Sequence, residues 1–318
     1  MARILLTGAS SFSGLWIAEA LVGAGHDVTA PLRRRRGDYE ALRADRVTRL
    51  MSTCRVVFEA PFASQAFADI LEEGFDLLAH HAADIADYRA ATYDVVEGVA
   101  RNVAGADAAF SALVRSGGVG VVVTGTTFEA GEGQSAPGDV AVSPYGLSKT
   151  LTNEALRNFA RWRGLRFAKF VIAAPFGPLE EGRFAWSLFQ RWFAGEPGLV
   201  RTPRYIRDNI PSPCLGAAYV ALVESVLSPS TPDQQIARPS GIIGSQEAFA
   251  RLLAGEMNHR LGLECAVETL PQTVLAEPEV RVNSDPWIKP DWPAQPFWDA
   301  YAAYYQKLAA SGLLAAPP

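Results

Sequence analysis

Cysteine is rare in this chain: Cys54, Cys214 and Cys265 are the only three among 318 residues. Their number is odd, they lie far apart, and they do not form the short spacings of a metal-ligand pair. A disulfide-stapled scaffold and a zinc-binding module are therefore excluded. We predict unpaired thiols in a reducing compartment and no metal site.

Long apolar runs are also absent. The N-terminal apolar residues are interrupted by the Thr-Gly-Ala-Ser-Ser stretch at 7–11, whereas a signal peptide has a continuous apolar region. No later segment has about 18 uninterrupted apolar residues, the length that a membrane helix needs. We predict a cytoplasmic protein without a membrane span.

Excess positive charge is missing too. The 29 Lys and Arg stand against 34 Asp and Glu, and only 20% of the residues are charged. A nucleic-acid-binding domain is normally basic, so this class of partner is excluded and a small-molecule substrate is favoured. The length suits one large α/β domain with a smaller second lobe.

Lysine is scarce, with 4 lysines against 25 arginines. One of them, Lys149, follows Tyr145 by four positions, a spacing that places both side chains on one face of a helix. With 9 tyrosines, such a pair is expected about 0.1 times by chance. A free phenol has a pKa of about 10, and a fixed cation beside it lowers that pKa. The pair therefore predicts a tyrosine that transfers protons near neutral pH.

The first half of the chain alternates short apolar runs with helical patterns. Six runs are typical of strands: residues 3–6, 27–30, 55–58, 77–80, 119–124 and 167–172. Four segments between them are typical of helices: residues 14–23, 65–73, 94–116 and 145–163. This alternation predicts an α/β fold with a doubly wound parallel sheet.

After residue 173 proline and glycine interrupt this pattern. Helices are expected at 215–227, 246–261 and 296–311, and a strand near 241–243. We predict two parts. The first is a dinucleotide-binding Rossmann domain at 1–173, to which 214–243 returns. The second is a smaller substrate-binding lobe formed by 174–213 and 244–318.

A glycine-containing turn, Thr-Gly-Ala-Ser-Ser-Phe-Ser-Gly at residues 7–14, follows the first strand and opens the first helix. At such a turn, backbone N–H groups and the helix N-terminus bind a dinucleotide pyrophosphate. Gly8 would make the tight turn and Gly14 would let the helix approach the sheet. Ser11 stands where a middle glycine is expected. The predicted cofactor-binding residues here are Gly8, Ser10, Ser11, Phe12 and Gly14.

The end of the second strand should carry the residue that distinguishes NAD from NADP. An NAD site usually has Asp or Glu there, but this chain has Arg33 and Arg34. Guanidinium groups suit a 2′-phosphate, so NADP is the predicted cofactor and NAD the alternative. The other interpretation is that the run at 33–36 is a solvated charged loop.

Threonines follow the buried strand at 119–123, in the sequence Thr124-Gly-Thr-Thr127. In parallel sheets ligands bind at the carboxyl ends of the strands, so a hydroxyl here could hold the substrate oxygen against Tyr145. Thr126 is our first candidate and Thr124 the alternative. A turn-capping role for these threonines is the other interpretation.

Together, the glycine turn, the strand-end threonine and Tyr-x-x-x-Lys resemble the short-chain dehydrogenase/reductase superfamily. The chain is most similar to its extended branch, the NAD-dependent epimerase/dehydratase type, which acts largely on nucleotide sugars. Further similar segments are His-His-Ala-Ala at 80–83, Asn-Val-Ala-Gly at 102–105, Ala-Pro-Phe-Gly-Pro at 174–178 and Arg-Asp-Asn-Ile at 207–210.

The resemblance implies roles for individual residues. Tyr145 would be the acid/base, Lys149 would hold the nicotinamide ribose, and Thr126 would bind the reacting oxygen. Arg207 would contact a substrate diphosphate. Arg281 is a second candidate phosphate binder, and the other interpretation is that either residue is a surface arginine in a salt bridge. The segments near the cofactor add a further set of implied contacts: His80, Ala82, Ala83 and Asn102.

Two features qualify these roles. His80 and His81 are adjacent on a strand and so point to opposite faces, which favours packing over joint metal ligation. Ala174 replaces an asparagine that often contacts the substrate diphosphate in this branch.

Three functions remain open. The first is an oxidoreductase that transfers hydride at a carbinol or keto carbon of a nucleotide sugar, with a keto-sugar reductase favoured by the NADP prediction. The second is a nucleotide-sugar epimerase acting through a transient ketone, and the third is a non-catalytic NADP sensor. A 4,6-dehydratase is disfavoured, because Thr127 and Phe128 stand where that branch has Asp-Glu.

The resemblance also implies a homodimer formed through the helices around 94–116 and 145–163.

Overall fold

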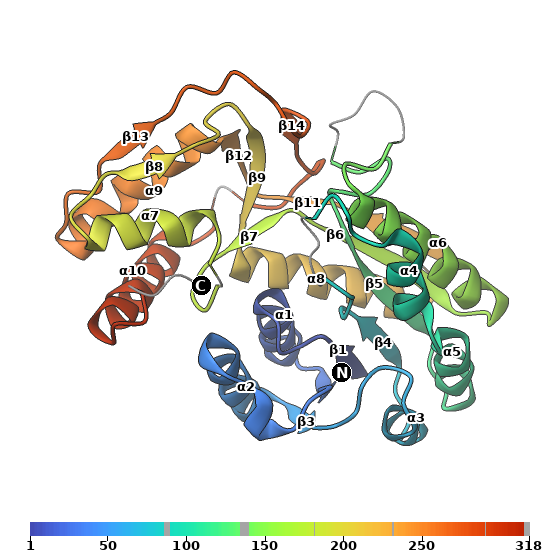
Figure 1. Ribbon diagram of the computed structural model, residues 1–318. Coiled ribbons are helices and arrows are strands. Elements are labelled where there is room, and N and C mark those ends of the chain that lie inside the picture. Colours follow the sequence, from blue (N-terminus) through green and yellow to red (C-terminus); the bar gives the residue numbers. More distant parts are fainter. Residues whose placement is uncertain (86–89, 134–139, 181, 231, 290, 315–318) are drawn as a thin grey trace.

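A computed structural model describes residues 1–318 except 86–89, 134–139, 181, 231, 290 and 315–318. Its centre is a sheet of seven parallel strands in the order β10-β6-β5-β4-β1-β2-β3 (Figure 1). The strands are β1 Arg3–Thr7, β2 Asp27–Pro31, β3 Arg55–Val57, β4 Leu77–His80, β5 Gly120–Thr126, β6 Arg166–Ile172 and β10 Gln234–Ala237. This confirms the doubly wound α/β fold.

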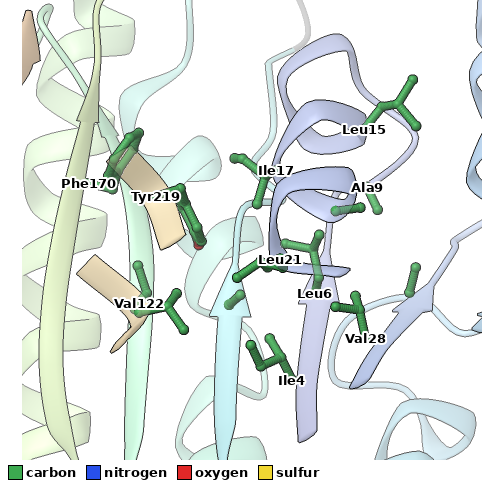
Figure 2. Close-up of a cluster of buried hydrophobic side chains, with 14 of the residues drawn as sticks. Ile4, Leu6, Ala9, Leu15, Ile17, Leu21, Val28, Val122, Phe170 and Tyr219 are labelled. Carbon is green, nitrogen blue, oxygen red and sulfur yellow. The ribbon is translucent and has the colours of Figure 1, made fainter. Parts of the chain in front are cut away.

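Helices cover both faces of this sheet because each strand alternates its side chains between them. On β1, Ile4 and Leu6 pack toward α1 and α8, whereas Leu5 packs on the other face against α3, α5 and α6. Figure 2 shows the first of these two layers, with the α1 side chains Ile17 and Leu21 above β1. The covering helices are α1 Phe12–Gly23, α2 Ala41–Thr53, α3 Gln65–Glu72, α4 Val95–Val103, α5 Ala106–Arg115, α6 Pro144–Trp162 and α8 Ser212–Leu227.

The helix expected at 94–116 is wrong as a single element. It is divided into α4 and α5 at Gly105, which has a φ of 69° in the left-handed region that ends a helix. The helices α2 and α7 were not expected from the sequence. Both lack a side-chain N-cap hydrogen bond, the usual sequence signal of a helix start.

A second group of elements lies beyond the carboxyl end of the sheet (Figure 1). Its helices are α7 Phe184–Phe193, α9 Gln246–Leu261 and α10 Ala294–Ala310, and they share an aromatic-rich core around Phe189, Trp192 and Tyr301. Its strands are β7 Ala174–Phe176, β8 Gly198–Val200, β9 Ile206–Pro211, β11 Pro239–Ser240, β12 Ile242–Ser245, β13 Val267–Thr269, β14 Val280–Arg281 and β15 Asp285–Pro286. A short 3-10 turn, η1 Arg36–Asp38, completes the elements. The domain boundaries at 173, 213 and 243 stay predictions.

Among the described residues no helix has the length and apolarity needed to cross a membrane. The same part of the chain holds no group of three or more His, Cys, Asp or Glu side chains placed to bind a metal ion.

Glu180 is a buried carboxyl group inside the aromatic core. It accepts hydrogen bonds from the hydroxyls of Tyr301 and Tyr305 on α10. Burial raises the pKa of Glu180 to about 7, although the two tyrosines oppose this shift. The group therefore stabilises the fold fully below its ordinary pKa of about 4.5, and this stabilisation is lost as pH rises through about 7.

We therefore expect the Glu180→Gln variant to have a flatter stability profile than the wild type. One pH unit of pKa difference corresponds to about 1.4 kcal/mol, so the wild type should lose about 3 kcal/mol more than the variant between pH 4.5 and 8. Urea unfolding at several pH values measures this difference. Glu247→Gln, in an exposed pair with Arg251, is the control. If the free energy of unfolding changed equally with pH in the wild type and in Glu180→Gln, the raised pKa assigned to Glu180 would be contradicted.

Candidate active site

The glycine turn joins β1 to α1 and forms a tight cradle. Gly8 has a φ of 74°, and a Cβ on it would lie 2.7 Å from the backbone nitrogen of Ala82. A Cβ on Gly14 would lie 2.3 Å from the carbonyl oxygen of Gly8. Only glycine fits either position, so the turn stays narrow and the first N–H groups of α1 face the carboxyl end of the sheet. These residues fit a dinucleotide pyrophosphate.

Ser11 takes a structural role where a middle glycine was expected. It is the N-cap of α1, and its side chain accepts a hydrogen bond from the backbone nitrogen of Gly14 at 3.0 Å. Its φ of −77° is accessible to any residue. The serine therefore keeps the turn conformation and satisfies one of the unpaired N–H groups of the helix start.

Basic side chains surround the end of β2, where the adenosine half of a dinucleotide would lie. Arg33 and Arg34 are exposed in the loop that follows the strand. Arg43 on α2, which sequence reasoning missed, places its Nε and Nη2 atoms 3.3 and 3.2 Å from the hydroxyl of Ser10. Its helix was not expected from the sequence, so nothing in the sequence pointed to Arg43.

The two histidines of the 80–83 segment do point in different directions. His80 is buried, with Nδ1 3.1 Å from the Thr7 hydroxyl, and it packs on Phe62. His81 lies between two hydroxyls, 2.9 Å from Ser13 Oγ and 2.8 Å from Thr124 Oγ1. Burial, and then the nearby Lys149 charge, lower the pKa of His81 to about 4, so its imidazole is neutral.

The residues after β4 lie against the glycine turn. Ala82 donates its backbone N–H to Thr7 Oγ1 at 3.0 Å, and Ala83 follows in the same loop. Asn102 on α4 is buried and accepts a hydrogen bond from the backbone nitrogen of Asp84 at 2.7 Å. Asn102 thus holds this loop in place.

Tyr145 and Lys149 lie one turn apart on α6 and both are buried. Ser143 caps the helix, and its hydroxyl accepts a hydrogen bond from Gly146 N at 3.1 Å. The Tyr145 ring is packed edge-on by Tyr93 and Phe128, with centroids at 5.8 and 6.3 Å. Lys149 Nζ donates to the carbonyl oxygen of Thr124 at 2.8 Å.

The two candidate threonines have different surroundings. The hydroxyl of Thr124 is held by His81 and its carbonyl by Lys149, so Thr124 forms part of the lysine's support. Thr126 is the last residue of β5 and is less buried. Among the residues that the structure describes, its hydroxyl makes one long contact, 3.4 Å, with the backbone nitrogen of Phe128. Thr126 therefore has the less constrained hydroxyl of the two, and it stays the first candidate for the group that meets a substrate.

The Thr126→Val and Thr124→Val variants separate these two roles. We expect Thr126→Val to lower kcat by about 10²-fold, because a hydrogen bond to the reacting oxygen is lost. Thr124→Val keeps the carbonyl that holds Lys149 and should cost less than tenfold. Steady-state kinetics of the two variants measure the difference, and the reverse order would assign the catalytic hydroxyl to Thr124.

Glu129 is a buried carboxylate that sequence reasoning did not place. It is 1% exposed, and its Oε1 atom accepts the backbone N–H of Thr126 at 2.7 Å. Its Oε2 atom accepts from Asn153 Nδ2 at 2.8 Å and lies 3.3 Å from Lys169 Nζ. The carboxylate thus faces inward and connects the strand end to α6.

The two arginines assigned to a diphosphate lie on neighbouring strands, Arg207 on β9 and Arg281 on β14. Arg207 is buried over the ring of Tyr205 at 4.2 Å. The guanidinium of Arg281 lies 3.8 Å from the centre of the Phe128 ring, and Phe128 also packs on Tyr145. The structure therefore brings this pair of arginines to the same site as the tyrosine. Ala174, at the start of β7, pairs with Asn209 of β9.

Comparison with known proteins agrees with this arrangement. Residues 4–202 match the model of the NAD dependent epimerase/dehydratase family. No curated protein matches the chain in sequence. Solved structures do match in fold.

The UDP-glucuronic acid 4-epimerase from Bacillus cereus, in complex with UDP-glucuronic acid and NAD, has a TM-score of 0.72 at 17% identity, covering 96% of this chain and 99% of that one. The UDP-glucose 4-epimerase from Thermotoga maritima, solved with UDP-glucose, has a TM-score of 0.68 at 17% identity, with 96% and 99% covered. The UDP-glucose 4-epimerase from Stenotrophomonas maltophila, with bound NAD and formylated UDP-arabinopyranose, has a TM-score of 0.70 at 16% identity, with 98% and 100% covered.

The fold and site define a nicotinamide-dependent enzyme of the oxidoreductase or epimerase type. Because the family model covers more than half of the chain, the protein belongs to the NAD dependent epimerase/dehydratase family. This confirms the resemblance inferred from the motifs.

Proposed function

We propose that the protein is a nucleotide-sugar epimerase that acts through a transient ketone. The observation that carries this proposal is the set of contacts that join α6 to the end of β5 and to the glycine turn: Lys149 to Thr124, Thr124 through His81 to Ser13, and Tyr145 to Phe128. The full-length similarity to UDP-sugar 4-epimerases favours the epimerase over the keto-sugar reductase that the arginines near β2 had suggested. The non-catalytic sensor is disfavoured because Tyr145 and Lys149 are both present.

The site residues would divide the reaction between them. A bound nicotinamide would supply the acceptor and donor of the hydride. Tyr145 would take the proton of the sugar hydroxyl as the carbonyl forms and return it to the same oxygen when the ketone is reduced on its other face. Thr126 would hold that oxygen, and the Lys149 charge would favour the phenolate form of Tyr145.

The experiment that tests this function is incubation of the protein with UDP-glucose or UDP-glucuronic acid and either cofactor. We expect the 4-epimer to form without net change in absorbance at 340 nm. Stoichiometric oxidation of the reduced cofactor by a nucleotide keto-sugar would instead assign a reductase. Binding without turnover across a panel of nucleotide sugars would assign a sensor.

We propose NADP as the preferred cofactor, with Arg33, Arg34 and Arg43 as the groups around its 2′-phosphate. The support is the cationic surroundings of β2 and the contact of Arg43 with Ser10 in the glycine turn. The Bacillus cereus and Stenotrophomonas maltophila structures contain NAD, so this preference would distinguish the present chain from them.

Arg43→Met is expected to weaken NADP binding by about tenfold and NAD binding by less than twofold, because only the 2′-phosphate makes the charged contact. Fluorescence titration with NADPH and NADH measures both affinities. Arg35→Met is the control, since the exposed Arg35 pairs with Glu59 instead. Equal losses for NADPH and NADH would contradict the role of Arg43.

We further propose that residues 1–173 and 214–243 bind the cofactor, while 174–213 and 244–318 bind the nucleotide sugar.

A homodimer through α4 and α6 is supported by the apolar side chains that these helices expose, Val96, Leu147 and Leu151. Sedimentation velocity tests the dimer, and a monomer at micromolar concentration would exclude it. A cytoplasmic location is supported by the three free cysteines, and thiol titration of the native protein tests their state.

A further inference from the structure

Two arginines face each other directly across a pair of strands. In the parallel pairing of β9 with β14, Arg207 is the register partner of Arg281. Their side chains are only 7% and 12% exposed. Like charges at directly opposite positions destabilise a sheet, and partial burial strengthens the repulsion. The two guanidinium groups therefore need a negatively charged group between them to offset their repulsion.

Glu277 supplies that anion in the present structure. A single oxygen, Oε2, accepts from Arg207 Nη2 at 3.1 Å and from Arg281 Nη1 at 2.9 Å. Burial lowers the pKa of the Arg207 guanidinium, and the Glu277 charge raises it again. The two guanidinium groups therefore share a single carboxylate oxygen of Glu277.

The carboxylate of Glu277 can leave without movement of its loop. The backbone N–H groups of Ala276 and Glu277 donate to the hydroxyl of Tyr205 at 2.8 and 3.0 Å. On the other side, Arg207 Nη1 donates to the carbonyls of Pro278 and Glu279 at 3.2 and 3.0 Å. The loop is thus anchored on both sides, whereas the Glu277 side chain is 42% exposed. Rotation of this side chain alone would open the site.

The arginine pair lies next to the reacting tyrosine. The Phe128 ring is in contact with Arg281 on one side and with Tyr145 on another, at 3.8 and 6.3 Å from its centroid. A substrate that presents a hydroxyl to Tyr145 therefore places the group attached across its sugar ring near the arginines. In a nucleotide sugar that group is the diphosphate.

We propose that Glu277 is a resident anion of the arginine pair, and that a nucleotide-sugar diphosphate binds by displacing its carboxylate. This inference rests on the proposed function for the identity of the ligand. Each guanidinium would gain its own phosphate in place of the one shared oxygen, which is the energetic reason for displacement. Glu277 then determines affinity: it keeps the arginines paired when no substrate is bound and competes with the substrate for them.

The test is the affinity of the Glu277→Gln variant for UDP and for inorganic pyrophosphate, measured by isothermal titration calorimetry on the full chain. We expect both ligands to bind about five- to tenfold more tightly than to the wild type at low salt, because a competing charge is removed while the side-chain volume is kept. The gain should shrink in 0.5 M NaCl through screening. The KM for the nucleotide sugar should fall.

Glu279→Gln is the matched control, since Glu279 lies in the same loop but pairs with Arg204. It should leave both affinities unchanged, and the melting temperatures of the two variants report any general loss of folding. Equal or weaker UDP binding by Glu277→Gln would overturn the inference while leaving the epimerase proposal intact. Tighter pyrophosphate binding by the variant, with no UDP binding by either protein, would support displacement but remove nucleotide sugars as substrates.

Discussion

Replacement of Tyr145 by phenylalanine is expected to lower kcat by about 10³- to 10⁴-fold, the upper range for loss of a positioned acid/base. Tyr145 is buried against Tyr93 and Phe128 and lies one helical turn before Lys149. Phenylalanine keeps the ring and its packing but removes the oxygen that would carry the proton. The change therefore affects the chemical step and leaves the surroundings of the ring in place.

Cofactor affinity separates this outcome from general damage. The glycine turn and the arginines near β2 are on other elements, so NADPH should bind to Tyr145→Phe within about twofold of the wild type. Tyr93→Phe is the control, because it makes the same change in the neighbouring ring and should keep most of the activity. More than a tenth of wild-type kcat in Tyr145→Phe would rule out the proposed mechanism.

Substitution of Glu129 by glutamine is expected to have the largest effect on stability, about 3–5 kcal/mol in the free energy of unfolding. The buried Glu129 carboxylate accepts from Thr126 N, Asn153 and Lys169. A glutamine amide presents N–H groups where donors already converge, and it leaves Lys169 with the remaining carboxylate, Glu132, as its buried partner. Because Glu132 also pairs with Arg238, the buried positive charge is then only partly compensated, and this is the source of the loss.

The pH dependence of activity should also change in Glu129→Gln, in a defined direction. Burial lowers the pKa of Lys149, Glu129 raises it again, and Lys169 lowers it. Without the Glu129 charge, Lys149 should lose its proton at lower pH, so the alkaline limb of the pH–rate profile should move to lower pH.

Urea unfolding and a pH–rate profile measure the two effects. Glu154→Gln, in the exposed pair with Arg157, is the control and should change stability by less than about 1 kcal/mol. An unchanged unfolding free energy in Glu129→Gln would refute the role of this network.

Part of the site could be predicted from the sequence because its signals are local. The glycine turn needs a strand, a tight turn and a helix start within twelve residues, and Tyr145 and Lys149 need only one turn of α6. The alternation of apolar and helical segments likewise determined the parallel sheet, since each strand buries both faces under helices. Six strands of the sheet and the family membership followed from these patterns.

Contacts between distant elements could not be predicted in this way. The pairing of Arg207 with Arg281, and the placement of Glu277 between them, depends on the register of β9 with β14, which are separated by about seventy residues. The same is true of Glu129, whose inward orientation depends on Lys169 of β6 and Asn153 of α6.

The sequence by itself therefore determined the fold class, the glycine turn and the placement of Tyr145 and Lys149 one helical turn apart, because short-range periodicity and turn geometry encode them. Only the tertiary structure decided that Thr124 supports Lys149 while Thr126 is less buried, that Arg43 reaches Ser10 of the glycine turn, and that Glu277 lies between Arg207 and Arg281. Those features depend on burial and on long-range register, which are properties of the packed chain and not of any segment alone.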